Sequence, residues 1–389
     1  MKILKIIAIV IVVFSVILAG LAWFGSRPLT HDQAAVEIKS AVDSTLNAKK
    51  SIYAGLVYVD APQKGISVKY AAGTSAGQPV DADQPFHVAS VGKLFTATLI
   101  GHLMDEGRLH LDDPIHTYLD DAVLENLFVV DEVDYKDQVT VGQLLSHTSG
   151  VADYFAKEDN GLQDALYLSP DTFYTPQSLL QYTREHQHAV FAPGTGYHYS
   201  DTGYILLGLI IESVTGQSFD ETLHAVIFDP LHMDDTYLMF YSDPVNGKRP
   251  IVEVWVDGHE VSRNESVSMD WAGGGVVSTL DNLAVFIRAL YHGEIIHPET
   301  LQSLNRFAYE FMPGINYGYG FMQMQFEKFF PTLGFLPQMT GHMGILGTEL
   351  FYDRATDMVY VASFGSSDAS SDSIRTMITI LSDVYRVRE

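Results

Sequence analysis

The stretch Phe86–Arg108 constrains the fold most, because a nucleophile pattern opens a clear helix pattern. Apolar residues recur at helical spacing after Ser90, and Gly107 supplies a helix stop. We therefore predict a helix that starts near Ser90 and carries Lys93 one turn later on the same face. A serine there lies at the positive end of the helix dipole, beside unpaired backbone N–H groups. A lysine amine that burial keeps neutral can accept the serine proton, so Ser90 is a candidate nucleophile.

Taken alone, this pattern also fits a helix-capping serine and a solvated lysine. Ser90 is the only serine in the chain with a lysine three residues later. A second nucleophile pattern, G-x-S-x-G, occurs at 73–77. That pattern requires a helix directly after it, and the residues 78–85 that follow read as a loop. We therefore predict that Ser75 is a turn residue.

Composition excludes several classes of protein. The 389 residues carry a net charge of −25, which argues against nucleic acid as a partner. The chain has no cysteine, so disulfides, thiolate metal sites and cysteine nucleophiles are absent. Hydrophobic residues make up 47% of the chain, enough for a large core.

The N-terminus reads as a membrane or export segment. Lys2 and Lys5 precede an unbroken apolar run, Ile6–Phe24, which is long enough as a helix to cross a bilayer. A cleaved signal peptide and a retained anchor both fit this run. Its length and the aromatic pair at its end favour the anchor. In either case everything after Ser26 is expected to be exported, and the protein would be secreted if the segment is cleaved.

The remaining pattern places strands near both ends of the chain and helices in the middle. Strand-like runs occupy 52–59, 66–71, 252–256, 261–267, 319–326, 338–342, 348–352 and 358–364. Helices are expected over 33–49, 139–146, 202–214, 281–291, 298–307 and 371–387. Residues 109–250 consist mainly of short helices and loops.

Three further segments carry polar groups suited to a cleft. A glycine-rich loop ends in Tyr199-Ser200-Asp201 before an apolar helix, where a tyrosine can reach into a site. The segment Ala272–Thr279 is rich in glycine and suits close backbone approach. His342-Met343-Gly344 lies at the end of a predicted strand. We interpret His147, at the end of a short helix, as a structural hydrogen-bonding residue.

Ser90-x-x-Lys93, Tyr199-x-Asp201 and His342-x-Gly344, in this order, resemble the serine β-lactamase and penicillin-binding-protein superfamily. The resemblance covers residues 33–389 and is strongest to the class C β-lactamase-like branch, which includes DD-peptidases, D-aminopeptidases and carboxylesterases. It implies an α+β fold, an α/β sandwich whose central antiparallel sheet is flanked by the terminal helices, with an inserted all-helical domain. It implies an N-terminal anchor or signal segment at 1–26. The α/β domain would have two parts, 27–108 and 251–389, and the inserted helical domain would occupy 109–250.

The resemblance also implies roles for single residues. Ser90, Lys93 and Tyr199 would be catalytic, with no metal or organic cofactor needed. Asp201, His342, Gly344 and Ile345 would bind substrate; the backbone N–H groups of Ser90 and Ile345 would form the oxyanion hole.

Two departures from the family pattern bear on specificity. Asp201 stands where the family usually has asparagine, and an ionised carboxylate cannot donate a hydrogen bond. His342 stands where many β-lactamases have lysine, and a neutral imidazole holds a carboxylate less strongly.

The expected function is therefore that of an exported, membrane-anchored serine hydrolase. It would form an acyl-enzyme on D-Ala-type peptides, including cell-wall peptide, or on β-lactams or related amides and esters. A carboxylesterase of the same fold is one alternative. The other is a non-catalytic, penicillin-binding-like module that senses wall material.

Overall fold

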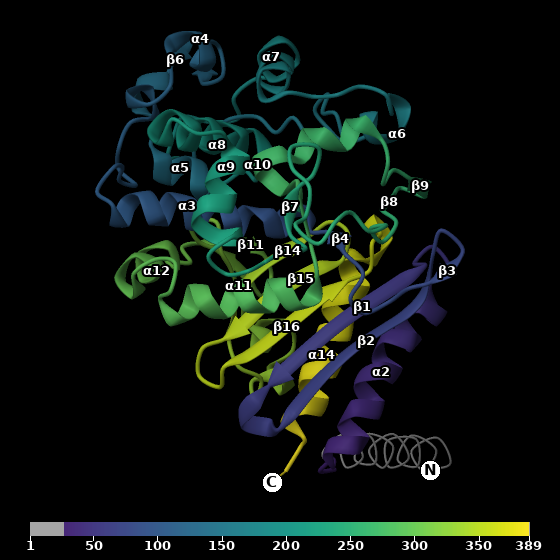
Figure 1. Cartoon of the computed structure of the whole chain (residues 1–389). Coiled ribbons are helices and arrows are strands. Elements are labelled where there is room, and N and C mark those ends of the chain that lie inside the picture. Colours follow the sequence, from purple (N-terminus) through teal and green to yellow (C-terminus); the bar gives the residue numbers. More distant parts are fainter. Residues whose placement is uncertain (1–26, 389) are drawn as a thin grey trace, which may run out of the picture.

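The computed structural model describes residues 27–388. A large sheet forms the centre of this part of the chain (Figure 1). Its strands are β1 (Ala54–Ala61), β2 (Ile66–Ser75), β3 (Gln78–Pro79), β11 (Tyr309–Met312), β12 (Ile315–Tyr317), β13 (Met322–Met324), β14 (Met339–Gly344), β15 (Thr348–Asp353) and β16 (Met358–Ser363). They pair antiparallel throughout, in the order β11-β12-β13-β14-β15-β16-β1-β2-β3.

The central strands are buried on both faces, so successive side chains enter two different cores. Leu56, Leu350 and Val361 belong to the core shared with the middle of the chain. Their neighbours Val57, Phe351 and Tyr360 belong to a second core. This double burial explains why these strands read as continuous apolar runs and not as an alternating pattern.

The helices divide between these two cores. The terminal helices, α2 (His31–Ala48) and α14 (Ser370–Tyr385), pack together over the second core. Helix α11 (Leu280–His292) packs on the other face against β1, β15 and β16. The predicted α+β fold with terminal helices flanking an antiparallel sheet is thus confirmed. The helices are α2 (His31–Ala48), α3 (Gly92–Asp105), α4 (Asp121–Leu124), α5 (Val141–Leu145), α6 (Ala165–Leu168), α7 (Pro176–His186), α8 (Asp201–Thr215), α9 (Phe219–Leu223), α10 (Trp271–Gly274), α11 (Leu280–His292), α12 (Pro298–Leu304), α13 (Phe326–Phe329) and α14 (Ser370–Tyr385).

Residues 109–250 contain helices α4 to α9, which form a layer beyond α3 and away from α2 and α14 (Figure 1). The only regular strands described in this segment have two residues each, β5 (Val129–Val130), β6 (Val133–Asp134) and β7 (Tyr237–Leu238). β7 joins a small sheet with β4 (Phe86–His87) and β10 (Val276–Ser278), which ties this layer to the segment before Ser90. The domain boundaries at 109 and 250 stay a prediction.

Several strand predictions need correction. Of the strand predicted over 319–326, only β13 (Met322–Met324) is formed, and α13 already begins at Phe326. The hairpin predicted over 252–267 shrinks to β8 (Trp255–Val256) and β9 (His259–Glu260), and Glu265–Asp270 forms a 3₁₀ helix. The hairpin of β11 and β12 was not predicted, because its strands are only four and three residues long and give little pattern to recognise. Within residues 27–388, no helix combines the length and apolar character needed to cross a membrane. The predicted anchor, Ile6–Phe24, lies outside the described residues.

Helices α8 and α10 pack closely because α8 contains glycine at the contact. A Cβ added to Gly208 would lie 2.6 Å from Trp271 Cζ3 and 2.7 Å from Ala272 Cβ. Gly203, also buried in α8, offers more room, since the nearest atom to an added Cβ is 3.5 Å away. This contact holds α10 beside the start of α8, where Asp201 lies.

We expect Gly208→Ala to lower the free energy of unfolding by about 1–3 kcal/mol, because the added methyl group forces the two helices apart. Gly203→Ala is the matched control, and it should be neutral or stabilising by up to about 1 kcal/mol through its helix propensity. Urea unfolding followed by tryptophan fluorescence measures both. Equal midpoints for the two variants would contradict the packing argument.

Candidate active site

Ser90 lies in a 3₁₀ turn, Ala89–Val91, that leads directly into α3. The preceding residue, Ala89, has a left-handed backbone with φ of 49°, a conformation that costs energy outside glycine. Ala89 N donates to His87 Nδ1 at 3.2 Å, which fixes this turn to β4. The predicted helix start is therefore correct, with one tight turn inserted before the helix proper.

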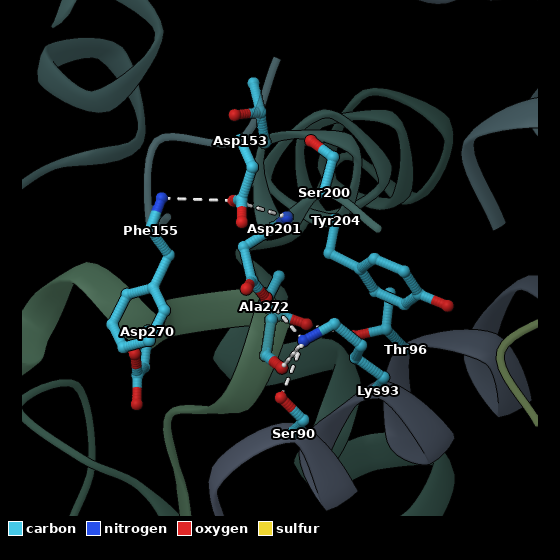
Figure 2. A network of polar contacts seen from close by, with 12 residues as sticks. Ser90, Lys93, Thr96, Asp153, Phe155, Ser200, Asp201, Tyr204, Asp270 and Ala272 are labelled. Atoms are coloured by element: carbon cyan, nitrogen blue, oxygen red, sulfur yellow. Dashed lines mark hydrogen bonds and ion pairs between the residues drawn. The ribbon is translucent and has the colours of Figure 1, made fainter. Parts of the chain in front are cut away.

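Lys93 is buried, with 0% exposure, and its ammonium group has all of its donors occupied. Nζ donates to Ser90 Oγ at 3.1 Å and to Gly273 O at 2.8 Å. The third contact is an ion pair with Asp201 Oδ1. Figure 2 shows Ser90, from the turn before α3, and Asp201, from the start of α8, beside the lysine. The predicted proximity of Ser90 and Lys93 is thus observed.

Two glycines let other backbone segments close on this turn. A Cβ added to Gly274 would lie 2.9 Å from Ala89 O. A Cβ added to Gly344, at the end of β14, would lie 2.8 Å from Ala89 Cβ and 3.1 Å from Ser90 N. Because real Cβ atoms do not approach so closely without a shift, α10 and β14 can reach Ser90 only with glycine at these positions.

Tyr199 reaches the same site from the loop before α8. Its ring centroid lies 5.0 Å from Lys93 Nζ, 4.1 Å from the ring of His147 and 6.0 Å from the ring of Tyr317. Burial, followed by the negative charge of Asp201, raises the pKa of Tyr199 well above its ordinary value, and a hydrogen bond with Ser90 opposes this rise. Tyr199 is therefore a neutral phenol that can donate a proton.

Two further carboxyl groups surround the Lys93–Asp201 pair, and the sequence did not single them out (Figure 2). Asp153 Oδ1 accepts from Asp201 N at 2.9 Å and from Phe155 N at 3.0 Å. Burial, and then the charge of Asp201, raises the pKa of Asp153 to about 7 and that of Asp270 to about 7. The single positive charge of Lys93 is thus surrounded by the carboxyl groups of Asp201, Asp153 and Asp270.

His342 is buried in β14 and uses both ring nitrogens internally. Nδ1 lies 2.7 Å from Met343 O, so it carries the proton, and Nε2 accepts from the Tyr317 hydroxyl at 3.1 Å. Burial and the charge of Lys93 lower the pKa of His342 to about 3. The imidazole is therefore neutral, as expected, and its role in binding substrate stays a prediction.

Ile345 lies in the turn between β14 and β15, directly after Gly344. Its carbonyl oxygen accepts from Ser370 Oγ at 2.7 Å, which ties this turn to the start of α14. The first residue of the terminal helix thus anchors the turn beside Ser90.

Outside the site, Ser75 ends β2, and its Oγ accepts from Glu253 N at 2.9 Å. No helix follows it, so Ser75 does not lie in a nucleophile elbow. The prediction of a turn residue was off by one position, because Ser75 still pairs with Gln78 and the turn is formed by Ala76-Gly77. Within residues 27–388, no cluster of three or more histidine, aspartate or glutamate side chains is arranged to hold a metal ion.

Comparison with known proteins agrees with this geometry. A family model described as Beta-lactamase matches residues 48–377. The chain belongs to the Beta-lactamase family. It is a serine hydrolase of this family, whose members include enzymes with several substrate classes.

Three relatives illustrate the range of the family. Esterase EstB of Burkholderia gladioli is 25% identical over 354 residues, which cover 82% of this chain and 88% of the esterase. Penicillin-binding protein 4 of Amycolatopsis lactamdurans is 35% identical over 155 residues, which are 40% of this chain and only 36% of that protein. The crystal structure of a D-stereospecific amidohydrolase from Streptomyces sp. superimposes with a TM-score of 0.72 at 25% identity, covering 87% of this chain and 97% of that one.

Proposed function

We propose that the chain hydrolyses amide or ester bonds next to D-amino acid residues through an acyl-enzyme on Ser90, as in a DD-carboxypeptidase or D-amino acid amidase. The observation that carries this proposal is the 3.1 Å contact between Ser90 Oγ and the buried Lys93 Nζ. A serine hydroxyl is a weak nucleophile unless an adjacent base takes its proton. The D-stereospecific amidohydrolase among the similar structures supports the D-amino acid part of the proposal.

The first chemical step requires Lys93 to become a proton acceptor. As an ammonium with three occupied donors it accepts none, but transfer of one proton to Asp201 leaves a neutral amine. Asp201 is the group placed to receive this proton, because its Oδ1 is already in contact with Lys93 Nζ. Ser90 then loses its proton to Lys93 as Oγ bonds to the substrate carbonyl carbon.

Tyr199 completes the proton transfer. Its phenol gives a proton to the leaving amine or alkoxide as the carbonyl–heteroatom bond breaks, and it regains a proton from the Lys93 ammonium. The net change moves the Ser90 proton to the leaving group. Hydrolysis of the acyl-enzyme runs the same path in reverse, with water in place of the leaving group.

The negative charge that develops on the substrate oxygen needs backbone donors. We assign this role to Ser90 N and Ile345 N, because Gly344 brings the β14–β15 turn against Ser90. His342 and Tyr317 stabilise this strand end by hydrogen bonding.

Ser90→Ala should abolish turnover of p-nitrophenyl acetate and all covalent labelling by a fluorescent penicillin, since Ser90 is the only serine within residues 27–388 whose hydroxyl contacts a lysine amine. The matched control is Ser75→Ala, in the second serine pattern, which should keep full activity. Intact-mass spectrometry and tryptic mapping locate the adduct. Activity that survives in Ser90→Ala would overturn the mechanism, and failure of the unaltered protein to react with either reagent would favour a non-catalytic binding module. Fast ester turnover without a penicillin adduct would favour a carboxylesterase.

Within this function, the carboxyl groups around Lys93 favour substrates with a free ammonium group near the scissile bond. Above about pH 7, where Asp153 and Asp270 lose their protons, these two carboxylates add negative charge to the Lys93–Asp201 pair. His87, with a pKa lowered to about 4 by burial, adds no positive charge. The same charge disfavours a substrate carboxylate at this point. A D-amino acid amide with a free amine fits this site better than an N-acylated analogue.

We expect D-alanine p-nitroanilide to react with a higher kcat/KM than its N-acetyl analogue. Asp270→Asn should lower the ratio of the two kcat/KM values by about tenfold or more. The attraction between the Asp270 carboxylate and the substrate ammonium exceeds about 1.4 kcal/mol at an effective dielectric of about 20, and this energy corresponds to a factor of about ten. The advantage should grow as pH rises through about 7, because Asp153 and Asp270 lose their protons there. A ratio unchanged by Asp270→Asn would contradict the charge argument while leaving Ser90 as the nucleophile.

The location of the protein is a separate part of the proposal. The apolar run Ile6–Phe24 behind Lys2 and Lys5 supports export with retention in the membrane. We expect the full chain to fractionate with membranes and a chain starting at Arg27 to be soluble, as measured by immunoblotting of fractions. A full-length chain found only in the soluble fraction, with its N-terminus at residue 1, would contradict this proposal.

A further inference from the structure

The backbone N–H groups of the two residues that flank Tyr199, His198 and Ser200, both donate to one residue on another segment. His198 N donates to His147 O at 2.9 Å, and Ser200 N donates to His147 Nδ1 at 3.1 Å. Tyr199 therefore lies between two hydrogen bonds that end on the same histidine. We infer that His147 is the positioning residue for Tyr199, a role that rests on the proposed function of Tyr199 in proton transfer.

The side chain of His147 adds a third contact. Its ring lies 4.1 Å from the Tyr199 ring, with 32° between the two planes. The rings of Tyr317 and Tyr204 lie 4.7 and 5.3 Å from the imidazole on other sides. The imidazole thus fixes the phenol by packing as well as through the loop backbone.

The protonation state of His147 suits this role. Burial, followed by the nearby charge of Lys93, lowers the pKa of His147 well below its ordinary value, so the ring is neutral. Because Nδ1 accepts from Ser200 N, the ring proton lies on Nε2. A protonated imidazole would lose this acceptor, and the neutral form keeps it.

His147 is itself held rigidly. It follows α5, and its N–H donates to Leu144 O at 3.2 Å, while Thr148 N donates to Gln143 O at 2.8 Å. Its φ of 58° lies in the left-handed region, which turns both the carbonyl and the ring toward the 198–200 loop. His147, in this backbone conformation, thus connects the end of α5 to the loop that carries Tyr199 through its hydrogen bonds.

Two substitutions separate the hydrogen bond from the packing. His147→Asn keeps an acceptor in place of Nδ1, and asparagine tolerates the left-handed conformation. His147→Phe keeps an aromatic ring and loses the acceptor. We expect His147→Phe to lower kcat for p-nitrophenyl acetate by about 10- to 100-fold with KM nearly unchanged, because a misplacement of about 1 Å costs this much. His147→Asn should stay within about threefold of the unaltered protein.

A double-mutant cycle with Tyr199→Phe tests whether His147 acts through the tyrosine. If it does, His147→Phe changes kcat by less than about twofold once Tyr199→Phe is present. Equal losses in both backgrounds, or a loss in His147→Asn as large as in His147→Phe, would overturn the inference. Full activity of Tyr199→Phe alone would instead refute the proposed role of Tyr199.

Thermal unfolding of each variant provides the control for folding. Should His147→Phe fail to fold, His147→Ala replaces it in the same cycle, since alanine also lacks the acceptor. A rise in kcat from His147→Ala to His147→Asn then supports the inference, and equal values overturn it.

Discussion

The buried Lys93 ammonium is the interaction on which the site depends. Its three contacts come from three different elements: Ser90 before α3, Asp201 at the start of α8 and Gly273 in α10. An uncompensated charge in this position would be very costly, so the three segments must be in place for the fold to be stable. Close packing of α8 on α10 through Gly208 is therefore part of the same arrangement. Structural stability and the proposed chemistry require the same contacts.

A sequence can predict this arrangement only in part. Ser90 and Lys93 were identified because their spacing and the helix pattern lie within one short segment. The central strands were identified because double burial makes β15 and β16 continuous apolar runs. A hydrogen bond can be foreseen from sequence only where its partners are close along the chain. This holds for Ser90 and Lys93, which are three residues apart, and not for His342 and Tyr317.

Asp153 and Asp270 show why the rest was missed. Asp153 comes a few residues after His147, and Asp270 comes just before the glycine-rich segment at 272–279. Both of those neighbours stand out in the sequence for other reasons. Nothing local distinguishes Asp153 and Asp270 from the other acidic residues of a chain that has 48. Their perturbed pKa values arise from burial and from Asp201, and both are properties of the assembled fold. The position of His147 was interpreted correctly as a hydrogen-bonding one, but its partner, Ser200, lies 53 residues away.

The order of strands in the central sheet has a consequence for how this chain becomes folded. β1 and β2 are made early, yet β1 pairs with β16, and Leu56 and Ser363 in this pair are separated by about 300 residues. Until β16 emerges, β1 presents an apolar edge with unpaired backbone groups, which invites pairing with other chains. Closing so long a loop is also slow. The early hairpin therefore needs protection from aggregation during synthesis until β16 has been made and pairs with β1.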